Sequence, residues 1–136
     1  MDLMKSLDIS ASAMRAQGTR LRIVAENLAN ANSTGETPND MPYRRQVVSF
    51  ESVLDRATGA HLVQVADVTA DDSAFTRKYE PGHPSADAEG YVLYPNVNSL
   101  VEMMDMREAQ RSYEANLSVV DIAKQMVMKT IDMLRT

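Results

Sequence analysis

The sequence predicts a mainly α-helical protein in which a small β-rich insertion separates two long terminal helices. Large apolar residues recur every seven positions near both ends of the chain, which is the spacing of one helix face. Near the N-terminus these residues are Leu7, Met14, Leu21 and Leu28. Near the C-terminus they are Met106, Tyr113, Val120, Val127 and Leu134. Between the two repeats, short runs of β-branched and aromatic residues are separated by Pro and Gly and therefore predict strands.

The composition excludes several classes of protein. At 136 residues, the chain is the size of one ordinary domain. Its net charge is -5 and its 14 Lys and Arg residues are scattered, so the basic patch of a nucleic-acid-binding protein is missing. Because this patch is missing, we expect no nucleic-acid partner. The sequence also has no Cys, which excludes disulfides and thiolate metal sites.

The N-terminal segment predicts neither a membrane span nor a secretory signal. No apolar run in the sequence approaches the roughly 18 residues that a membrane-spanning helix needs. Ser6, Asp8, Ser10 and Ser12 interrupt the apolar residues, whereas a secretory signal needs a continuous apolar region. We expect no membrane insertion, and we expect any export to proceed without a cleavable signal peptide.

The first predicted helix begins near Asp2 and ends between Asn30 and Gly35, where Asn, Ser, Thr and Gly cluster. A row of small residues runs beside its large row and allows another helix to approach closely. This small row consists of Ala11, Gly18 and Ala25. Because a lone helix is marginal in water, we expect this face to pack against a second helix.

The residues after the first helix predict a connector followed by strands. Residues 33–42 are rich in turn formers, and their two prolines prevent a helix. Residues 43–50 have the β-branched and aromatic bias of a strand, and residues 51–56 either continue that strand or form a helical turn. A further short strand is predicted at residues 62–69.

A hairpin with a long loop is predicted next. Residues 75–79 alternate in the period-two pattern of a strand, and residues 91–94 form a second short β-prone run. Residues 81–90 form the loop between them. Because strands this short are unstable alone, we expect this module to pack on a helix or on a neighbouring molecule.

The second terminal helix is predicted from Ser99 onward. Ser99 and Glu102 have the S-x-x-E spacing of a capping box, and no Gly or Pro follows. The large row is flanked on one side by Met103, Leu117 and Ile131 and on the other by Ala109 and Ala123. At about 50 Å the helix would match the first in length, so the two predict an antiparallel hairpin with coiled-coil-like packing.

The two helices have more large apolar residues than one helix–helix contact can bury, which indicates further neighbours. The additional residues are Ile9, Ile23 and Val24 in the first helix and Met104, Val119, Ile122 and Met126 in the second. Asn116 and Lys124 lie among the apolar rows, where polar residues either specify a partner or reach solvent at the edge of the seam.

Several strings of residues carry a family resemblance. Residues 25–35 read AENLANANSTG, which resembles the N-terminal signature of bacterial flagellar rod and hook proteins, where a long helix ends in an N-L-A-N-A element before a turn. The strings YRR at 43–45, YEPGHPSADAEGYV at 79–92, PNVN at 95–98 and SYEAN at 112–116 resemble the proximal rod members of that family. The resemblance covers nearly the whole chain, although residues 51–75 match no pattern of the family.

The resemblance implies a structural subunit of the flagellar basal body. Such subunits polymerise with themselves and with other rod proteins into the proximal rod, a drive shaft that crosses the periplasmic space and transmits motor torque. The resemblance also implies export by the flagellar type III apparatus and contacts with the MS-ring junction and adjacent rod segments. It implies an inner core made of residues 1–33 and 99–136, with residues 34–98 forming the connector and the β-rich module.

The residues of both seven-residue rows and of the small row are the candidate helix seams. The family motifs add candidate subunit contacts, which are Asn27, Leu28, Asn30, Tyr43, Arg44, Pro81, Gly82, His83, Pro84 and Asn116. For the amides of Asn27 and Asn30 two roles are open: binding backbone groups of an adjoining subunit, or capping the last turn of the first helix.

Two other functions fit the sequence less well. An enzyme needs convergent catalytic groups, but His61 and His83 are far apart in sequence, so we expect no catalytic residue, metal or cofactor. The acidic pairs at 71–72 and 87–89 lack the ligand spacing of a calcium loop. A soluble two-helix adaptor that binds a partner helix would explain the apolar rows, but not the resemblance in the middle of the chain.

Overall fold

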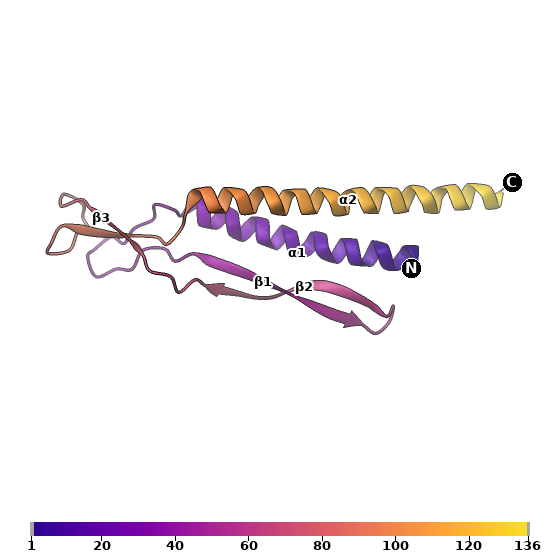
Figure 1. The fold of residues 1–136 in the computed structure, drawn as a ribbon, viewed down its shortest axis with the longest axis horizontal. Helices are drawn as coiled ribbons and strands as arrows, with labels where there is room; N and C mark the ends of the chain where they lie inside the picture. The colour runs from indigo at the N-terminus through magenta and orange to yellow at the C-terminus, as the bar shows by residue number, and fades with distance from the viewer. Residues whose placement is uncertain (1, 136) are drawn as a thin grey trace. The chain divides into compact units, whose positions relative to one another are not determined.

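The structure is a computed structural model that describes residues 2–135. Its elements in chain order are α1 (Leu3–Ala29), β1 (Gln46–Asp55), β2 (Ala60–Ala70), β3 (Thr76–Tyr79), β4 (Tyr91–Tyr94) and α2 (Ser99–Arg135) (Figure 1). The predicted fold class, two long terminal helices with short strands between them, is confirmed. The strands form two separate two-stranded sheets, β1–β2 and β3–β4.

Side chains close both ends of α1. The carboxylate of Asp2 accepts the backbone N–H of Met4 at 3.3 Å and caps the N-terminus of the helix. At the other end, the Asn30 amide donates to the carbonyl of Glu26 at 2.9 Å, and the Ser33 hydroxyl donates to the amide oxygen of Asn30 at 3.1 Å. The carbonyl of Glu26 also accepts the backbone N–H of Asn30 at 3.1 Å, so Asn30 bonds the last turn through both its backbone and its side chain.

The start of α2 differs from the predicted capping box. The side-chain oxygen of Asn98 accepts the backbone N–H groups of Leu100 and Val101 at 3.1 and 3.4 Å, so Asn98 is the N-cap. Glu102 does not reach back to Ser99. Its carboxylate is buried and binds an arginine instead, which is why the S-x-x-E spacing was misleading here.

The long hairpin resolves the open alternative for residues 51–56. Residues 51–55 continue β1, and the helical turn is wrong. The predicted strand at 62–69 is confirmed as part of β2. In the turn between the strands, Gly59 has φ 69°, and the carboxylate of Asp55 accepts the hydroxyl of Thr58 at 2.8 Å. This bond, with two backbone N–H groups, holds the pKa of Asp55 below its usual range.

Residues 43–45 were predicted as strand but precede β1. Their backbone is bonded to loops and side chains: the N–H of Tyr43 donates to the carbonyl of Ser33 at 3.0 Å, and the carbonyl of Arg45 accepts the N–H of Asp71 at 2.8 Å. The backbone N–H of Arg45, for example, donates to the side-chain oxygen of Asn96 at 2.8 Å.

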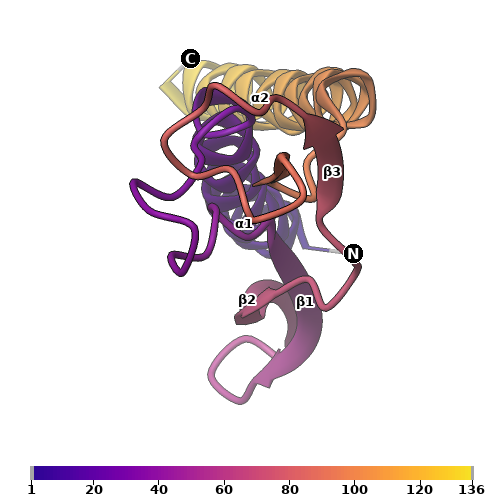
Figure 2. The same ribbon diagram turned by 90° about the vertical axis from the view of Figure 1, so that its left-hand side faces the viewer.

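The predicted short hairpin is confirmed as the antiparallel pair β3–β4, in which Thr76 faces Tyr94 and Tyr79 faces Tyr91. The backbone N–H of Tyr91 donates to the Asp87 carboxylate at 2.8 Å, and this bond is the largest cause of the lowered pKa of Asp87. Gly90 has φ 88°, and a Cβ there would lie 2.9 Å from the ring of Tyr79. Figure 2 shows β3 and the loops of this region.

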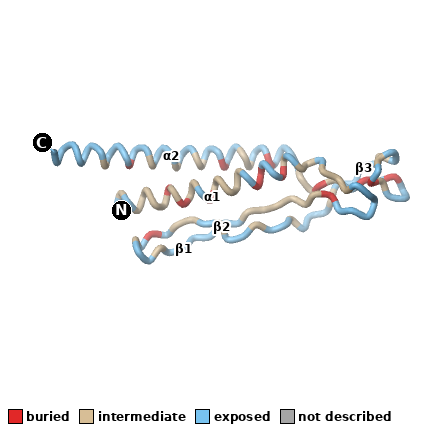
Figure 3. The backbone as a smooth tube through the Cα atoms, turned by 180° about the vertical axis from the view of Figure 1, so that it is seen from behind, coloured by how far each residue is buried: buried red, intermediate tan, exposed pale blue. Residues whose placement is uncertain are grey.

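The chain divides into two compact units. Unit 1 comprises Met1–Leu21, Ser49–Asp67 and Arg107–Thr136, and unit 2 comprises Arg22–Val48 and Val68–Met106. In unit 2, Val92 is fully buried and Ile23 and Val24 are 4% and 5% exposed. Figure 3 shows that most of α2 is exposed.

Candidate interaction surfaces

Asn27, the first amide of the N-L-A-N-A string, is the centre of a buried polar cluster in unit 2. Its amide nitrogen donates to the carbonyl of Gln46 at 2.9 Å and to Glu102 at 3.3 Å. Its oxygen accepts the hydroxyl of Tyr43 at 2.7 Å and the backbone N–H of Gln46 at 3.0 Å. The side chain of Asn27 thus gives Gln46 the two bonds that a neighbouring strand would give it, at the residue where β1 begins.

Glu102 completes this cluster from the first turn of α2. It is fully buried, and its two carboxylate oxygens accept the Nε–H of Arg45 and the amide of Asn27. A buried carboxylate is costly unless it is paired and hydrogen-bonded, and here both conditions are met. We call Asn27, Tyr43, Arg45, Gln46 and Glu102 the Asn27 cluster.

Arg45 connects the Asn27 cluster to further acidic residues of unit 2. Its guanidinium lies 3.2 Å from the carboxylate of Asp71 and 3.6 Å from that of Asp105. Burial alone would lower the pKa of Arg45, but the hydrogen bonds and charges of Glu102 and Asp71 outweigh it and raise the pKa. The pKa of Tyr43 is raised, mainly by burial and further by the charges of Glu26 and Glu102.

Internal bonds bear on the two open roles of the Asn amides. Asn27 is 1% exposed and both its side-chain atoms are bonded within the chain, so we assign it an internal role. The Asn30 amide caps the last turn of α1, and the side chain is half-buried. Contact of Asn30 with an adjoining subunit remains a prediction.

The remaining family-motif residues of unit 2, Arg44 and residues 81–84, lie in loops or bind loop carbonyls. The guanidinium of Arg44 donates to the carbonyls of Asp71 and Ser73 at 2.7 and 3.1 Å and stacks 4.2 Å from the ring centre of Phe75. His83 accepts the backbone N–H of Ser85 at 3.0 Å, and the hydroxyl of Ser85 donates to the carbonyl of Gly35. Pro81, Gly82 and Pro84, in the same loop, are exposed.

Apart from the half-buried Asp105 and Ser112, the residues of α2 that the chain covers follow a heptad pattern. Every member is buried or half-buried, and the spacing alternates between four and three residues. The members are Glu102, Met106, Ala109, Tyr113, Asn116, Val120, Ala123 and Val127. Half of these positions are the predicted large row. Leu134, the last member of that row, is 82% exposed.

In unit 1 this covered face of α2 lies against α1. The guanidinium of Arg20 pairs with Glu108 at 3.3 Å. Farther along, Ala11, Met14, Arg15 and Gly18 of α1 form an apolar groove of about 470 Å³ with Tyr113 and Val120 of α2. An added Cβ at Gly18 would meet nothing within 4 Å, so the small row of α1 borders open space. We call this hollow the Gly18 groove.

Large apolar side chains elsewhere on α2 in unit 1 are uncovered. They are Leu117, Val119, Ile122, Met126, Met128, Ile131, Met133 and Leu134, which are between 42% and 82% exposed. In contrast, Ile23 and Val24 of α1, which the sequence assigned to outside neighbours, are buried within unit 2. That expectation was wrong for these two residues, because unit 2 itself covers this part of α1.

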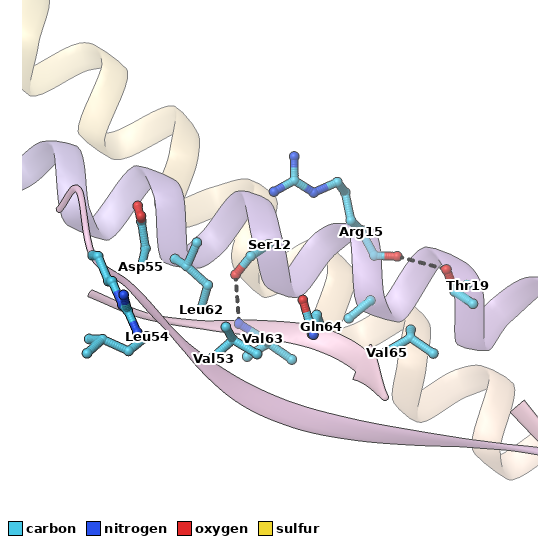
Figure 4. Close-up of a pocket in the computed structure, with 12 residues that line it drawn as sticks. Ser12, Arg15, Thr19, Val53, Leu54, Asp55, Leu62, Val63, Gln64 and Val65 are labelled. Atoms are coloured by element: carbon cyan, nitrogen blue, oxygen red, sulfur yellow. Dashed lines mark hydrogen bonds between the residues drawn. The ribbon is translucent and has the colours of Figure 1, made fainter. Parts of the chain in front are cut away.

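A second hollow of unit 1 lies between α1 and the β1–β2 hairpin and has a volume of about 580 Å³ (Figure 4). Ser12 is 2% exposed, and its hydroxyl accepts the backbone N–H of Val63 at 3.1 Å. Val53, Leu62 and Val65 line the hollow, and Arg15 points away from it in Figure 4. Sequence patterns did not indicate this hollow, because residues 51–75 carry no recognisable motif.

The remaining properties concern chemistry and membranes. Among residues 2–135, no three or more His, Asp or Glu residues gather into a group that could hold a metal ion. No helix within that range is long and apolar enough to span a bilayer. The two hollows of unit 1 and the exposed apolar side chains of α2 have features suited to a macromolecular partner.

Known proteins resemble this chain over nearly its whole length. Residues 7–35 match the family described as flagella basal body rod protein, and residues 88–133 match the one described as flagellar basal body rod FlgEFG protein C-terminal. The flagellar basal-body rod protein FlgC of Agrobacterium fabrum is 51% identical over 93% of this chain and 91% of the relative. The chain belongs to the FlgC family of flagellar basal-body rod proteins.

More distant FlgC relatives agree with this assignment. The FlgC protein of Escherichia coli O6:H1 is 45% identical over 96% of this chain and 97% of its own length. That of Bacillus subtilis is 40% identical over 93% and 95%. The predicted family is thus confirmed. The FlgC family is a family of structural rod proteins and not a family of enzymes.

Proposed function

We propose that the chain is a structural subunit of the flagellar basal-body rod whose exposed α2 face is covered by neighbouring subunits. The observation that carries this proposal is the set of uncovered apolar side chains on α2, in a protein of the FlgC family. Fully burying an exposed side chain of this kind is favourable by about 1.5–3 kcal/mol, and covering the 42–82% of each that is still exposed contributes part of that amount, which favours assembly.

Subunits joined head-to-tail without closure form a helical array rather than a ring. The two seven-residue rows and the small row supply the helix seams, and α1 and α2 pair as an antiparallel, coiled-coil-like hairpin. In this arrangement residues 1–33 and 99–136 form the inner core of the rod, and residues 34–98 lie outside it. Torque passes as shear through many helix contacts.

The proposed surroundings follow from the family. The chain assembles with itself and with other rod proteins, next to the MS-ring junction and adjacent rod segments. It reaches the periplasmic space through the flagellar type III apparatus without cleavage of a signal peptide. It catalyses no reaction.

The test compares two variants of α2 in a motile strain that lacks the wild-type gene. Ile122→Ser together with Met126→Ser removes two exposed apolar side chains, and Asp121→Ser together with Gln125→Ser is the matched control on the same turns. We expect the first variant to be exported but absent from purified basal bodies, with swimming lost. Normal swimming of the Ile122→Ser, Met126→Ser strain would contradict the proposal.

A further inference from the structure

The two sheets described within residues 2–135 have two strands each, so every strand has one edge that faces away from its partner strand. A two-stranded hairpin is marginally stable alone in water. An edge whose backbone groups are unpaired can add a strand from another chain. Which of these edges the chain itself occupies therefore decides where a partner strand can bind.

The outer edges of β2 and β4 carry bonds from the same unit. In unit 1, the backbone N–H of Val63 in β2 donates to the hydroxyl of Ser12 at 3.1 Å. In unit 2, the backbone N–H of Tyr91 in β4 donates to the carboxylate of Asp87 at 2.8 Å, and the carbonyl of Tyr91 accepts the backbone N–H of Asp87 at 2.9 Å. Asp87 thus gives Tyr91 the two bonds that a neighbouring strand would give it.

The outer edge of β3 is open. The backbone N–H of Glu80 donates to the carbonyl of Gly90 at 2.9 Å, directly after the β3–β4 pairing. Bonded pairs alternate along an antiparallel ladder, so Arg77 and Tyr79 turn their backbone groups away from β4. Within residues 2–135, no group accepts or donates a bond to this outward backbone, and all four residues of β3 are exposed.

The outer edge of β1 is open beyond its first residue. Asn27 occupies this edge at Gln46 through two bonds. From residue 47 to residue 54, no described residue outside the hairpin bonds the backbone. Residues 49–54 are all exposed, among them Phe50, Val53 and Leu54 at 37%, 37% and 51%. A long exposed edge with apolar side chains favours pairing with another strand.

The two open edges carry opposite charge. β1 contains Glu51 and Asp55 and no Lys or Arg, whereas β3 contains Arg77 and Lys78 and no Asp or Glu. Asp55 is bonded within its own turn, and Arg77 lies 3.6 Å from the carboxylate of Asp87. In the part of the chain that the structure describes, Glu51 and Lys78 form no ion pair. They are the charges available to a partner.

Charge also selects between the possible pairings of these edges. Opposite charges on adjacent strands stabilise a sheet, and like charges directly opposite one another destabilise it. Two copies of β3 would bring four cations together, and two copies of β1 would bring their carboxylates together. Glu80, directly after β3, does not offset the cations of that edge, because it is half-buried and accepts the hydroxyl of Tyr94 at 2.9 Å. The favourable combination is β1 with β3.

We propose that β1 of one copy adds to the open edge of β3 in a second copy of this chain, with Glu51 beside Lys78. The contact joins two hairpins into one four-stranded sheet, in which β1 and β3 are the central strands. It is heterologous, because each copy offers β1 to one neighbour and β3 to another, so it propagates without closing. This inference rests on the proposed function and specifies a contact outside the terminal helices.

Disulfide cross-linking tests the contact directly, because the natural sequence has no Cys. Glu51→Cys and Lys78→Cys each replace an exposed side chain, so both are compatible with the fold. Neighbouring strands lie about 4.8 Å apart, and a disulfide needs Cα atoms within about 7 Å. A bond within one copy leaves a monomer on a non-reducing gel, whereas a bond between copies gives oligomers.

We expect oxidised basal bodies carrying Glu51→Cys and Lys78→Cys to yield covalent dimers and higher oligomers, at least tenfold more than either single variant. Glu51→Cys with Leu93→Cys is the matched control. Leu93 is also exposed but lies on β4, about 10 Å from the neighbour's β1 and beyond the reach of a disulfide. If the first pair assembles and swims but gives no more oligomer than the control, the inference is overturned while the rod function stands.

A charge exchange gives a second readout without Cys, and it decides the matter if the Cys variants do not assemble. Glu51→Lys and Lys78→Glu should each reduce the swimming-ring diameter at least twofold, because each places like charges on the adjacent strands. The two together should restore most of the diameter. A double variant that swims no better than either single variant would also overturn the inference.

Discussion

Unit 2 and unit 1 are built from parts of the same two helices and the same β1–β2 hairpin, but they differ in which side chains they bury. Unit 2 buries Asn27 and Glu102 at 1% and 0% exposure and satisfies both within the chain. Unit 1 leaves Ile122, Met126 and Leu134 more than half exposed. Buried, satisfied polar groups favour one arrangement over others, whereas exposed apolar groups favour association. Unit 2 thus satisfies its buried polar groups within one subunit, although Met41, Leu100 and Met104 of unit 2 are also exposed, at 74%, 68% and 64%. The two units therefore differ in their interiors, and both have apolar surface suited to neighbours.

The largest loss of stability in unit 2 is expected when its buried carboxylate, that of Glu102, is removed. We expect Glu102→Ala to lower the free energy of unfolding by about 3 kcal/mol, the lower end for a broken buried pair, because Arg45 and the Asn27 amide each lose one partner while Arg45 keeps Asp71 and Asp105. Urea denaturation of the purified chain, followed by near-UV circular dichroism of its tyrosines, measures the change.

Glu108→Ala is the matched control for this substitution. It removes a glutamate from the same helix that also pairs with an arginine, Arg20, but the Glu108 side chain is 72% exposed. Exposed pairs contribute at most about 1 kcal/mol. A Glu102→Ala variant as stable as the control would show that the Asn27 cluster does not hold unit 2 together.

A smaller effect separates the two asparagines of the family motif. We expect Asn27→Ala to cost about 1–3 kcal/mol, because it leaves the backbone of Gln46 and the hydroxyl of Tyr43 unpaired in a buried place. Asn30→Ala removes the side-chain bond to Glu26 at the end of α1 and the bond from the Ser33 hydroxyl, and it should cost about 0.5–1 kcal/mol.

Thermal denaturation of the two variants measures this difference in stability. Assembly of the variants into basal bodies then shows whether either asparagine also contacts a neighbouring subunit. If Asn30→Ala is nearly as stable as the wild type but fails to assemble, Asn30 contacts a neighbouring subunit as the sequence predicted. Equal destabilisation by both variants would instead contradict the internal role assigned to Asn27.

The helices, the short hairpin and the family could be read from the sequence because each depends on a local or recurring pattern. The seven-residue rows identified α1 and α2, and the YEPGHPSADAEGYV string marked the family. Even the covered face of α2 follows the predicted spacing, from Met106 to Val127.

The Asn27 cluster could not be read in the same way, because its members are brought together from three separate segments. Glu102 satisfied the capping-box rule locally, and nothing nearby in sequence indicated that Arg45 would bind it. One signal was present: Glu102 occupies a position of the heptad that also contains Ala109, Asn116 and Ala123. An acidic residue in a covered row needs a basic partner, and that requirement predicts a buried ion pair but not which arginine supplies it.

The smallest expected effect is the most informative about unit 1. Ile122→Ser should change the stability of the isolated chain by no more than about 0.5 kcal/mol, because the side chain is 57% exposed and loses little packing. Val92→Ser, which removes a fully buried side chain from unit 2, is the comparison and should cost several-fold more. Chemical denaturation of both variants measures the two changes. A large loss of stability for Ile122→Ser would mean that this α2 face is already covered in the free subunit, and its exposure would then no longer support a role in assembly.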